Sequence, residues 1–386
     1  MRQRGFRPED IGSLEDLQKL PILTKADIRS HREALVALNM PMKHMVPGRT
    51  GGSTGEPLQF YHDGAALSAV RAAKYRALGW WGIELGDPEV MIWGSPIDIK
   101  RADTIHGIGT RLLNRRILPA FRLSEESMLT YARMLANWRP KLIYGYASSL
   151  TLMGRFLMQN NSTFGDWHPA LVVSTTEVLT PQNRELIQQA FRSPVADEYG
   201  SREAGILAFQ CPHGSMHIAA ENLIIETVRG GKPCAQGELG ELVVTDLNNK
   251  AMPLIRYAIG DVGVLGTRAC SCGRNLPVLE SLGGRVNDIV VTPDGTLLTG
   301  SFFPHFFKDY AFVRQFQVRQ PVLNRLEVLL TTYSEPSEAE LAQVRVALQR
   351  FVTSEMAISF KLVDDIPLTP AGKLRHVLSD VSAEFL

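Results

Sequence analysis

The segment from Leu171 to Tyr199 is the part of this sequence that most restricts the fold. Leu171–Val173 is an apolar run of the kind that forms buried strands, and Ala196–Tyr199 resembles a second one. Between them, Thr180-Pro181 is typical of a helix start, with a capping hydroxyl and a first-turn proline. Apolar residues then follow at helical spacing, at Leu186, Ile187, Ala190 and Phe191. A strand, a helix and a strand within about thirty residues predict a crossover unit in a mainly parallel sheet.

Two changes of pattern divide the rest of the chain. After Gly205, the stretches 224–245 and 254–265 alternate, which predicts antiparallel strands between glycine-rich turns. After Gly283-Gly284, strands are expected near 316–318, 326–330 and 358–362. They flank a helix whose predicted apolar stripe contains Leu341, Val344, Leu348 and Phe351. We therefore expect an α/β protein with a large domain at 1–284, a hinge at 285–288 and a small α+β domain at 289–386. Further helices are expected at 14–31, 65–78 and 124–138.

Composition excludes several classes of protein. The 386 residues, 45% of them hydrophobic and 21% charged, suit a soluble globular protein of two or three domains. A net charge of +1 gives no indication of nucleic acid or of an anionic membrane as partner. No apolar run approaches the ~20 residues of a membrane span, and no secretion signal is evident at the N-terminus. We expect a cytoplasmic location.

Thr50-Gly51-Gly52-Ser53-Thr54-Gly55-Glu56-Pro57 is a turn rich in glycine and hydroxyl groups. Glycines let backbone N–H groups approach an anion closely, and Ser and Thr add neutral donors. No Gly-Lys-Ser/Thr follows, so this is not a Walker loop. Taken alone, the segment fits a flexible surface loop better than a phosphate site.

Glu198-Tyr199-Gly200-Ser201-Arg202-Glu203 comes directly after a predicted strand. Residues at the carboxyl end of a parallel strand commonly face the ligand crevice. Tyr199, beside Gly200, is placed to stack on a base, and Glu203 is placed to hold Mg²⁺ against phosphate oxygens. The same residues are equally able to cap a helix.

Three later segments offer groups for the rest of a nucleotide. Ile255–Asp261 places the Asp261 carboxylate on a tight turn, where it can accept two hydrogen bonds from a ribose diol. In Gly284-Arg285-Val286-Asn287-Asp288, Arg285 could reach ribose or phosphate and Asp288 could act as a pivot, although a solvated linker is the simpler interpretation. Near the C-terminus, Lys373 stands on a Gly-flanked turn, which can bring a compact, mobile ammonium to a phosphate.

In this order, the segments resemble the adenylate-forming (acyl-CoA synthetase) superfamily. The resemblance is closer to the phenylacetate–CoA ligase branch and its capsular-polysaccharide relatives of the CapK kind. The branch cues are Thr-Gly-Gly-Ser-Thr-Gly-Glu-Pro at 50–57, Leu-Pro-Ile-Leu-Thr-Lys at 20–25, and Cys-Pro-His-Gly at 211–214 paired with Cys-x-Cys-Gly-Arg at 270–274. The resemblance spans essentially the whole chain.

The resemblance implies a fold and a role for each motif. The large N-terminal adenylate-forming domain would contain mixed and parallel sheets with helices plus a β-barrel-like part, and the small C-terminal domain would act as a lid. Thr50–Gly55 would hold the β- and γ-phosphates, Glu203 would bind Mg²⁺, and Asp261 and Arg285 would take the ribose hydroxyls. Ser174-Thr175-Thr176-Glu177 would lie against adenine. Lys373 would bridge the α-phosphate and the carboxylate.

The resemblance also implies an activity. A carboxylic acid, aryl or small, would react with ATP·Mg²⁺ to give an acyl-adenylate and pyrophosphate, and the acyl group would pass to a nucleophile, in this branch most often the thiol of coenzyme A. The small domain would rotate about Asp288 between the two steps and withdraw Lys373. Two alternatives stay open: an amine or sugar acceptor in polysaccharide biosynthesis, and a catalytically inactive nucleotide-binding homologue that serves as a partner or scaffold. The sequence leaves a homodimer open.

Three departures from the family pattern bear on this interpretation. Glu56 stands where many family loops carry a lysine, and Thr175 and Thr176 replace small residues, so the phosphate and adenine contacts are expected to differ. The chain also begins near its Leu-Pro-x-x-Thr-Lys segment, whereas the family has several dozen residues before it. For the acyl pocket we expect Tyr144-Gly145-Tyr146-Ala147-Ser148, Trp80-Trp81 and residues near Ser174, although such aromatics are also common in ordinary cores.

Four cysteines are too few for a disulfide framework in a chain of this length. Cys211 and His217 precede Cys270 and Cys272 by about fifty residues, and three thiols with one imidazole match a closed tetrahedral zinc site. Such a zinc would be structural, fastening the region after Glu203 to the region after Asp261. His213 is the rival fourth ligand, Cys234 lies outside the pattern, and reduced residues without metal are the alternative.

Overall fold

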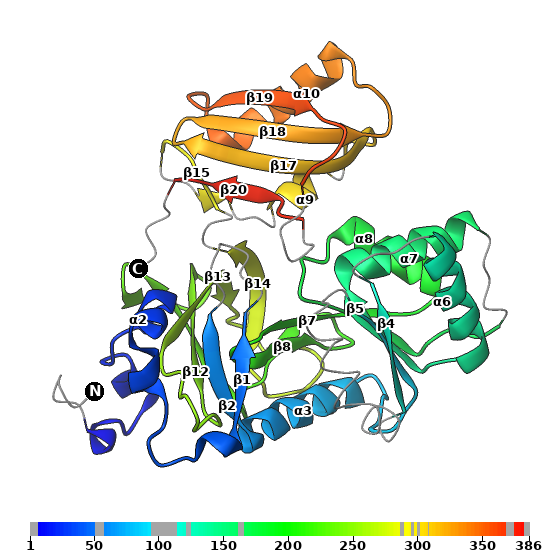
Figure 1. The fold of residues 1–386 in the computed structure, drawn as a ribbon. Coiled ribbons are helices and arrows are strands. Elements are labelled where there is room, and N and C mark those ends of the chain that lie inside the picture. The colour runs from blue at the N-terminus through cyan, green and yellow to red at the C-terminus, as the bar shows by residue number, and fades with distance from the viewer. Residues whose placement is uncertain are drawn as a thin grey trace.

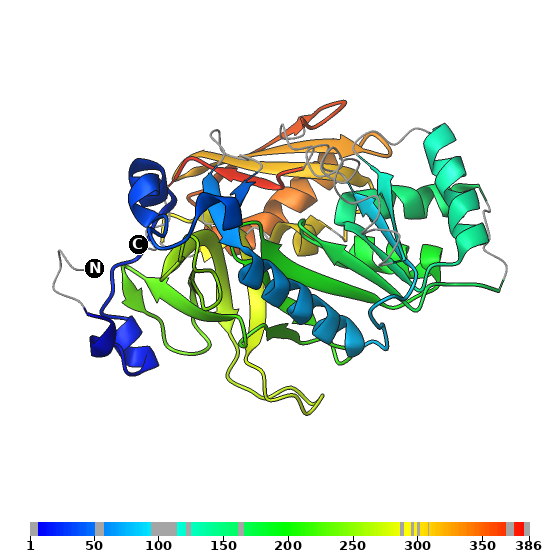
Figure 2. The same cartoon turned by 60° about the horizontal axis from the view of Figure 1, so that its bottom comes forward.

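The computed structural model describes residues 7–50, 58–93, 114–120, 125–160, 166–285, 289–294, 297–298, 302–307, 309–367 and 374–381. Within these residues, twelve strands form one continuous sheet in the order β11-β10-β12-β13-β14-β9-β8-β7-β6-β5-β3-β4 (Figures 1 and 2). Neighbouring strands are parallel from β4 to β7 and antiparallel from β7 to β11. The strands of the parallel part are β3 (Glu89–Trp93), β4 (Arg115–Pro119), β5 (Leu142–Tyr146), β6 (Leu171–Thr175) and β7 (Val195–Ser201). Those of the antiparallel part are β8 (Gly205–Gln210), β9 (Met216–Ile218), β10 (Leu223–Arg229), β11 (Lys232–Pro233), β12 (Leu239–Asp246), β13 (Tyr257–Leu265) and β14 (Val278–Arg285).

The predicted crossover unit is confirmed by β6, α8 (Pro181–Phe191) and β7. Thr180 caps α8, since its hydroxyl accepts a hydrogen bond from the Asn183 backbone N–H, and Pro181 occupies the first turn. The two strands pair in parallel, and Thr175 lies opposite Glu198 at the end of the register. The unit therefore delivers the ends of β6 and β7 to the same edge of the sheet.

Helices cover both faces of the parallel part. One face packs against α6 (Glu125–Trp138), α7 (Ala147–Gln159) and α8, through a core that includes Leu135, Met153 and Phe191. The other face packs against α3 (Gly64–Gly79), where Ala77 and Leu78 contact the strand residues. Burial on both faces explains why these strands read as unbroken apolar runs.

The antiparallel part encloses a second core together with the N-terminal elements. Phe60, from the hairpin of β1 (Met45–Arg49) and β2 (Gln59–Asp63), packs with Leu242 of β12 and Tyr257 of β13. Ile28 of α2 (Lys25–Leu35) lies in the same cluster, and α1 (Leu14–Leu17) precedes it. The expected barrel-like part is this curved half of the sheet with the hairpin packed across it.

A smaller body follows β14 (Figure 1). Its sheet has the order β19-β18-β17-β20 and is covered by α10 (Glu338–Val352). The other elements are β15 (Val290–Val291), β16 (Leu297–Leu298), α9 (Phe302–Phe307), β17 (Val313–Val322), β18 (Arg325–Thr332), β19 (Ala357–Leu362) and β20 (Val377–Ser379). The predicted β-β-α-β succession is confirmed, and β20 adds a parallel strand beside β17.

The predicted apolar stripe of α10 is wrong at its last position. Val344 and Leu348 are buried as expected, but Phe351 is half exposed and Val352 is buried in its place. Steps of four residues keep side chains close to one face of a helix, so the stripe continues from 348 to 352. Phe351 instead packs edge-on against Phe306, with ring centroids 6.1 Å apart.

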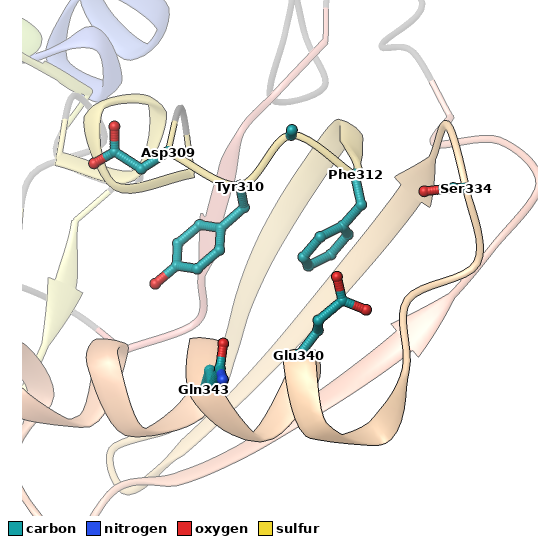
Figure 3. Close-up of a pocket in the computed structure, with 7 residues that line it drawn as sticks. Asp309, Tyr310, Phe312, Ser334, Glu340 and Gln343 are labelled. Atoms are coloured by element: carbon teal, nitrogen blue, oxygen red, sulfur yellow. The ribbon is translucent and has the colours of Figure 1, made fainter.

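A pocket of about 360 Å³ opens on the small body between α10 and the segment after α9 (Figure 3). Its lining includes Asp309, Tyr310, Phe312 and Glu340. The Glu340 carboxylate accepts hydrogen bonds from the backbone N–H and hydroxyl of Ser337, forming the capping box of α10. The carboxylate in this pocket therefore serves the helix. Among the described residues of the whole chain, no helix is long and apolar enough to cross a membrane.

Candidate active site

The predicted site residues divide by whether the structure describes them. Gly51, Gly52, Ser53, Thr54, Gly55, Asp288 and Lys373 lie outside the described residues, and for Arg285 only the backbone is described. The described ones are Thr50, Thr175, Thr176, Glu177, Tyr199, Gly200, Glu203, Asp261, Cys211, His217, Cys270 and Cys272. Most of them lie at the ends of β6 and β7 and along β13.

The Glu203 carboxylate is buried just after β7 and is held by a tyrosine. The Tyr257 hydroxyl donates a hydrogen bond to Glu203 Oε1 at 3.0 Å. Burial, and then the charge of Glu203, raise the pKa of Tyr257 far above its usual range, so the phenol stays a donor. Sequence reasoning gave Tyr257 no role, although it lies inside the Arg-Tyr-x-x-Gly-Asp motif.

Tyr199 and Asp261 are brought together across the sheet. The Tyr199 hydroxyl donates to Asp261 Oδ2 at 2.7 Å. Asp261 in turn lies opposite Arg285 in the β13–β14 register, so two residues predicted to hold the ribose are neighbours in the backbone. The predicted tight turn is wrong: Asp261 lies within β13, and Gly260, with φ of +85°, belongs to a bulge where β13 shifts its pairing with β12.

The base of the predicted phosphate loop lies against the Glu203 motif. The Thr50 backbone N–H donates to the Leu58 carbonyl at 3.0 Å, and the Thr50 hydroxyl accepts from the Leu58 N–H at 2.9 Å. Just beyond, Arg202 donates to the Arg49 carbonyl at 3.5 Å, and the His62 ring lies 3.1 Å from the Arg202 carbonyl. The hairpin therefore carries the loop to the segment that holds Glu203.

Two basic residues near the start of β13 were not predicted as functional. Lys25 donates from Nζ to the Ile259 carbonyl at 2.7 Å, two residues before Asp261 on β13. Arg256, buried, pairs with Glu226 at 3.0 Å and donates to the Leu20 carbonyl. The Leu-Pro-x-x-Thr-Lys cue was the available signal: Arg256 fixes this segment to the sheet, and the segment delivers Lys25.

The predicted adenine segment follows β6. Thr176 has a left-handed backbone, with φ of +68°, and the Glu177 carboxylate accepts from the Ser148 N–H at the start of α7 at 2.8 Å. The Thr175 hydroxyl donates to Glu198 Oε1 at 3.1 Å, so its side chain is engaged with a buried acid that sequence reasoning did not select.

Aromatic residues gather beside the Glu198 side chain, and one of them, Trp93, was not predicted. Tyr144 stacks on Trp93 with ring centroids 6.1 Å apart, and Trp93 also meets Tyr146 edge-on at 4.8 Å. Trp80 and Trp81, also expected at the acyl pocket, pack against the same hydrophobic cluster as Tyr144 and Trp93. Trp80 packs edge-on against His217 at 5.5 Å, and the Trp81 indole N–H donates to the Gln210 carbonyl, since both follow α3 toward the cysteine-bearing turns.

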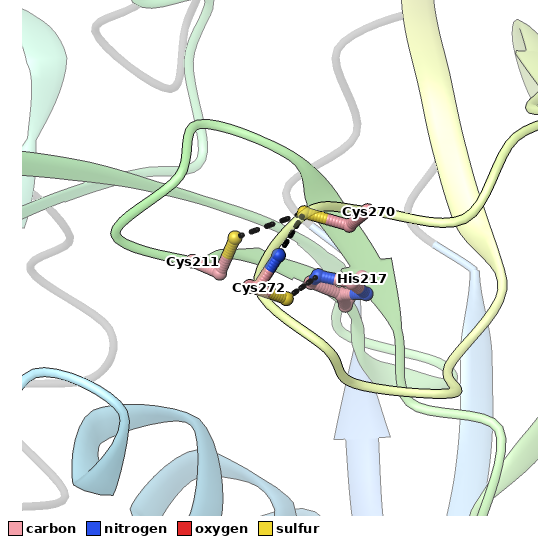
Figure 4. Close-up of side chains that lie close together, drawn as sticks. All are labelled: Cys211, His217, Cys270 and Cys272. Atoms are coloured by element: carbon pink, nitrogen blue, oxygen red, sulfur yellow. Dashed lines mark hydrogen bonds between the residues drawn. The ribbon is translucent and has the colours of Figure 1, made fainter.

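The cysteine cluster forms as predicted with His217 (Figure 4). One ligand atom from each of Cys211, His217, Cys270 and Cys272 lies within 4.8 Å of all the others. His217 Nε2 is 3.1 Å from Cys272 Sγ, and its Nδ1 is 3.4 Å from the Leu276 carbonyl. The rival, His213, instead lies 3.0 Å from the Ser271 hydroxyl. The Ser215 hydroxyl is the main cause that lowers the pKa of Cys270 to about 7, which favours a thiolate.

Comparisons with known proteins agree with this geometry. Residues 290–380 match a family model described as the CapK C-terminal domain. The chain is 24% identical to protein CapK of Staphylococcus aureus, covering 96% of this chain and 81% of that protein. It is 23% identical to the phenylacetate-coenzyme A ligase of Thermus thermophilus, covering 97% and 90%.

Solved structures of similar fold point the same way. One is 2-hydroxyisobutyryl-CoA ligase in the postadenylation state with R3-HIB-AMP, with a TM-score of 0.77, 19% identity and coverage of 98% of this chain and 84% of that one. Another is an anthranilate CoA ligase with anthranoyl-AMP, with a TM-score of 0.62, 15% identity and coverage of 85% and 65%. Along nearly its whole length the chain is therefore similar to protein CapK and to phenylacetate-coenzyme A ligase, and it has the two-part fold of solved acyl-CoA ligases.

Proposed function

We propose that the protein is an ATP-dependent, AMP-forming acid–thiol ligase that activates an aryl or small carboxylic acid and transfers it to coenzyme A. A carboxylate oxygen bonds to the α-phosphorus of ATP while the bond from that phosphorus to the bridging oxygen breaks, and pyrophosphate leaves. The thiol sulfur then bonds to the acyl carbon, AMP leaves and the thiol proton passes to solvent. The similarity to phenylacetate-coenzyme A ligase along 97% of the chain supports this reaction class.

One observation carries this proposal: groups suited to separate parts of a nucleotide meet at one edge of the sheet. The base of the Thr50 loop contacts the segment that carries Glu203, and the Tyr199–Asp261 hydrogen bond closes the same region from β13. A carboxylate such as Asp261 accepts both hydroxyls of a ribose. Positioning of this kind is the main contribution a protein makes to phosphoryl chemistry.

Glu203 fits the role of a magnesium ligand. Its carboxylate is an oxygen donor of the kind Mg²⁺ prefers, and Mg²⁺ commonly takes only one or two protein carboxylates together with substrate phosphates. When bound, Mg²⁺ would neutralise charge on the phosphate oxygens. The protein's own part is to fix Glu203 Oε1 through the Tyr257 hydroxyl, so that the carboxylate does not turn away from the loop.

Lys373 and Asp288 complete the proposal, although both lie outside the described residues. Lys373 would contact the α-phosphate and the carboxylate during adenylation, and the small domain would turn about Asp288 before thioester formation. Support comes from the match of residues 290–380 to the CapK C-terminal domain and from β20, which fixes the chain soon after the lysine turn.

The test is ATP–pyrophosphate exchange with a panel of carboxylic acids. We expect acid-dependent exchange in the wild type and a loss of about 10³-fold or more in Lys373→Ala, with ATP binding measured by calorimetry largely kept. Exchange at the wild-type rate in the variant would refute the role of Lys373. Absence of acid-dependent exchange in the wild type would favour the inactive nucleotide-binding homologue.

A second candidate differs only in the acceptor. The similarity to CapK along 96% of the chain leaves open an amine or sugar hydroxyl as the nucleophile, in polysaccharide biosynthesis. Once an activated acid is known, release of AMP with coenzyme A, and separately with amines and sugars, decides between the acceptors.

We also propose that Cys211, His217, Cys270 and Cys272 hold a structural zinc ion. The donor set of three thiols and one imidazole is typical of closed zinc sites. The Leu276 carbonyl beside His217 Nδ1 favours a proton on that nitrogen, which leaves Nε2 with its lone pair toward the thiols. The ion would fasten the turns after β8 and β13.

Metal analysis of the purified protein tests the zinc proposal. We expect about one zinc per chain, and Cys272→Ser should lose the metal and lower the Tm. Cys234→Ser is the matched control, since Cys234 lies outside the cluster beside the Leu239 carbonyl and should keep both. Wild-type protein with far less than one zinc per chain would refute the proposal.

A further inference from the structure

The Glu198 carboxyl group, one residue before Tyr199, has an arrangement that the proposed reaction does not use. The side chain is 93% buried, at 7% exposure, near the end of β7. Its Oε1 atom accepts hydrogen bonds from the hydroxyls of Tyr144 and Thr175, which come from β5 and β6. The acid is therefore fixed by hydroxyl groups from the adjacent parallel strand β6 and from β5, the strand beyond it.

The second oxygen, Oε2, is buried without a hydrogen-bond partner among the described residues. A buried polar atom left without a partner is costly, and more so when it is charged. Burial is the main cause that raises the pKa of Glu198 above its usual value. In either protonation state Oε2 lacks a partner, as an acceptor when ionised and as a donor when protonated.

Nearby polar groups are already engaged with other residues. The Lys74 ammonium pairs with Glu89 Oε1 at 2.9 Å and lies 4.0 Å from the centre of the Tyr144 ring. Glu89 also accepts from Arg115 at 2.8 Å. Because Lys74 and Arg115 pair with Glu89, neither donates a hydrogen bond to Glu198 Oε2.

The position of Glu198 fits the acyl end of an acyl-adenylate. Successive side chains of a strand leave opposite faces, so Glu198 and Tyr199 divide the end of β7 between them. Tyr199 serves the side that holds Asp261, whereas Glu198 lies with Tyr144 and the Trp93 ring that stacks on it. Aromatic side chains beside a buried acid whose second oxygen has no partner among the described residues suit a mainly apolar group that carries a single polar substituent.

We propose that Glu198 selects an acyl substrate bearing a hydroxyl or amino substituent, which completes the hydrogen bonding of its Oε2 atom. This inference rests on the proposed ligase function and names the substrate class of that site. A site built to hydrogen-bond a substrate hydroxyl strongly rejects the analogue that lacks it, because the protein's polar group is then left unpaired.

Matched acids that differ only in this substituent provide the test. The pairs are 2-hydroxyisobutyrate with 2,2-dimethylpropanoate, and 4-hydroxyphenylacetate or 4-aminophenylacetate with 4-methylphenylacetate. One of the two pairs is expected to react faster in ATP–pyrophosphate exchange. Within that pair, we expect the acid with the hydroxyl or amino group to have a kcat/KM about 10²-fold higher than the acid with a methyl group in its place. Glu198→Leu should remove or invert that ratio.

Glu198→Gln guards against a folding failure of the leucine variant, because it keeps the shape of the side chain. Because a glutamine amide can still hydrogen-bond a hydroxyl or a neutral aryl amine, this variant should keep part of the preference for polar members that Glu198→Leu loses. Glu327→Gln makes the same chemical change on β18 of the small body and serves as the matched control. Calorimetry measures the binding of each acid in the presence of AMP, as a readout that does not depend on catalysis.

The outcomes distinguish this inference from the proposed function. Exchange with every acid but no preference for polar members, unchanged in Glu198→Leu, would overturn the role of Glu198 and leave the ligase proposal standing. No exchange, with acid binding that prefers polar members and depends on Glu198, would defeat the ligase proposal and support the binding role. Neither exchange nor binding would overturn both.

Discussion

Two buried tyrosine–carboxylate pairs flank the end of β7, and they differ in what completes them. Tyr257 donates to Glu203, next to the base of the Thr50 loop. Tyr144 donates to Glu198, which also accepts from Thr175 and keeps one oxygen without a partner among the described residues. The first pair sits within the nucleotide motifs, and the second lies among apolar and aromatic side chains. The same chemical pair therefore suits a metal-bearing phosphate in one setting and an acyl substituent in the other.

The largest difference is expected when each carboxylate is made neutral. Glu203→Gln should lower exchange by about 10³-fold with every acid, because the charge that would hold Mg²⁺ is lost while the shape is kept. Glu198→Gln should lower it by about 10-fold, and only for acids with a polar substituent. Both are measured at saturating ATP, with Glu327→Gln as control. If Glu203→Gln retains more than a tenth of wild-type exchange, the pairs do not have the distinct roles described.

The tyrosines sharpen the comparison with a smaller effect. Tyr257→Phe frees the Glu203 carboxylate to turn and should raise the KM for ATP several-fold, with little change in the KM for the acid. Tyr144→Phe should do the reverse. Each variant should also lose about 1 kcal/mol of stability, since one buried hydrogen bond is removed. A KM for ATP that rises equally in both variants would contradict the division of β7 into a nucleotide side and an acyl side.

The sequence predicted the first pair's carboxylate but not the second's for a physical reason. Glu203, Asp261 and Tyr199 belong to motifs that the sequence predicts to bind one nucleotide, and the crossover unit places Tyr199 and Glu203 at the end of β7. Glu198 looked like part of a strand, and its partner Tyr144 is 54 residues away. Only the parallel register of β5, β6 and β7 brings them together.

Other features also depend on contacts between distant segments. Trp80-Trp81 were predicted to line the acyl pocket, and they pack against the cluster that contains Tyr144, while Trp80 also meets His217 edge-on. Trp93, which does lie beside Tyr144, carried no local signal. The cysteine cluster was predictable, because two short turns supply its donors. Which histidine joins depends on how β9 pairs with β14, where His217 lies opposite Val278.

A third buried carboxylate, Glu241 on β12, is expected to have the smallest effect, which is on thermal stability. It allows the effect of burial to be measured without a hydrogen bond from a tyrosine. Burial is the main cause that raises its pKa to about 7, Lys25 opposes the shift and Asp261 adds to it. Since this value exceeds the ~4.3 of an unfolded Glu, the folded state binds the proton more tightly. The contribution to stability is therefore full below about pH 4 and is lost as pH rises through about 7.

Glu241→Gln cannot ionise, so its stability should not fall in this way. At pH 5 we expect a Tm close to that of the wild type, and at pH 8 a Tm higher by about 2–4 °C, equivalent to about 1–2 kcal/mol. Thermal unfolding of both proteins at the two pH values is the measurement, and Glu327→Gln should show no such difference. A variant no more stable than the wild type at pH 8 would mean that Lys25 offsets the burial of Glu241 in full. In that case, burial alone would also be too weak to imply that Glu198 Oε2 requires a hydrogen-bond partner from a ligand.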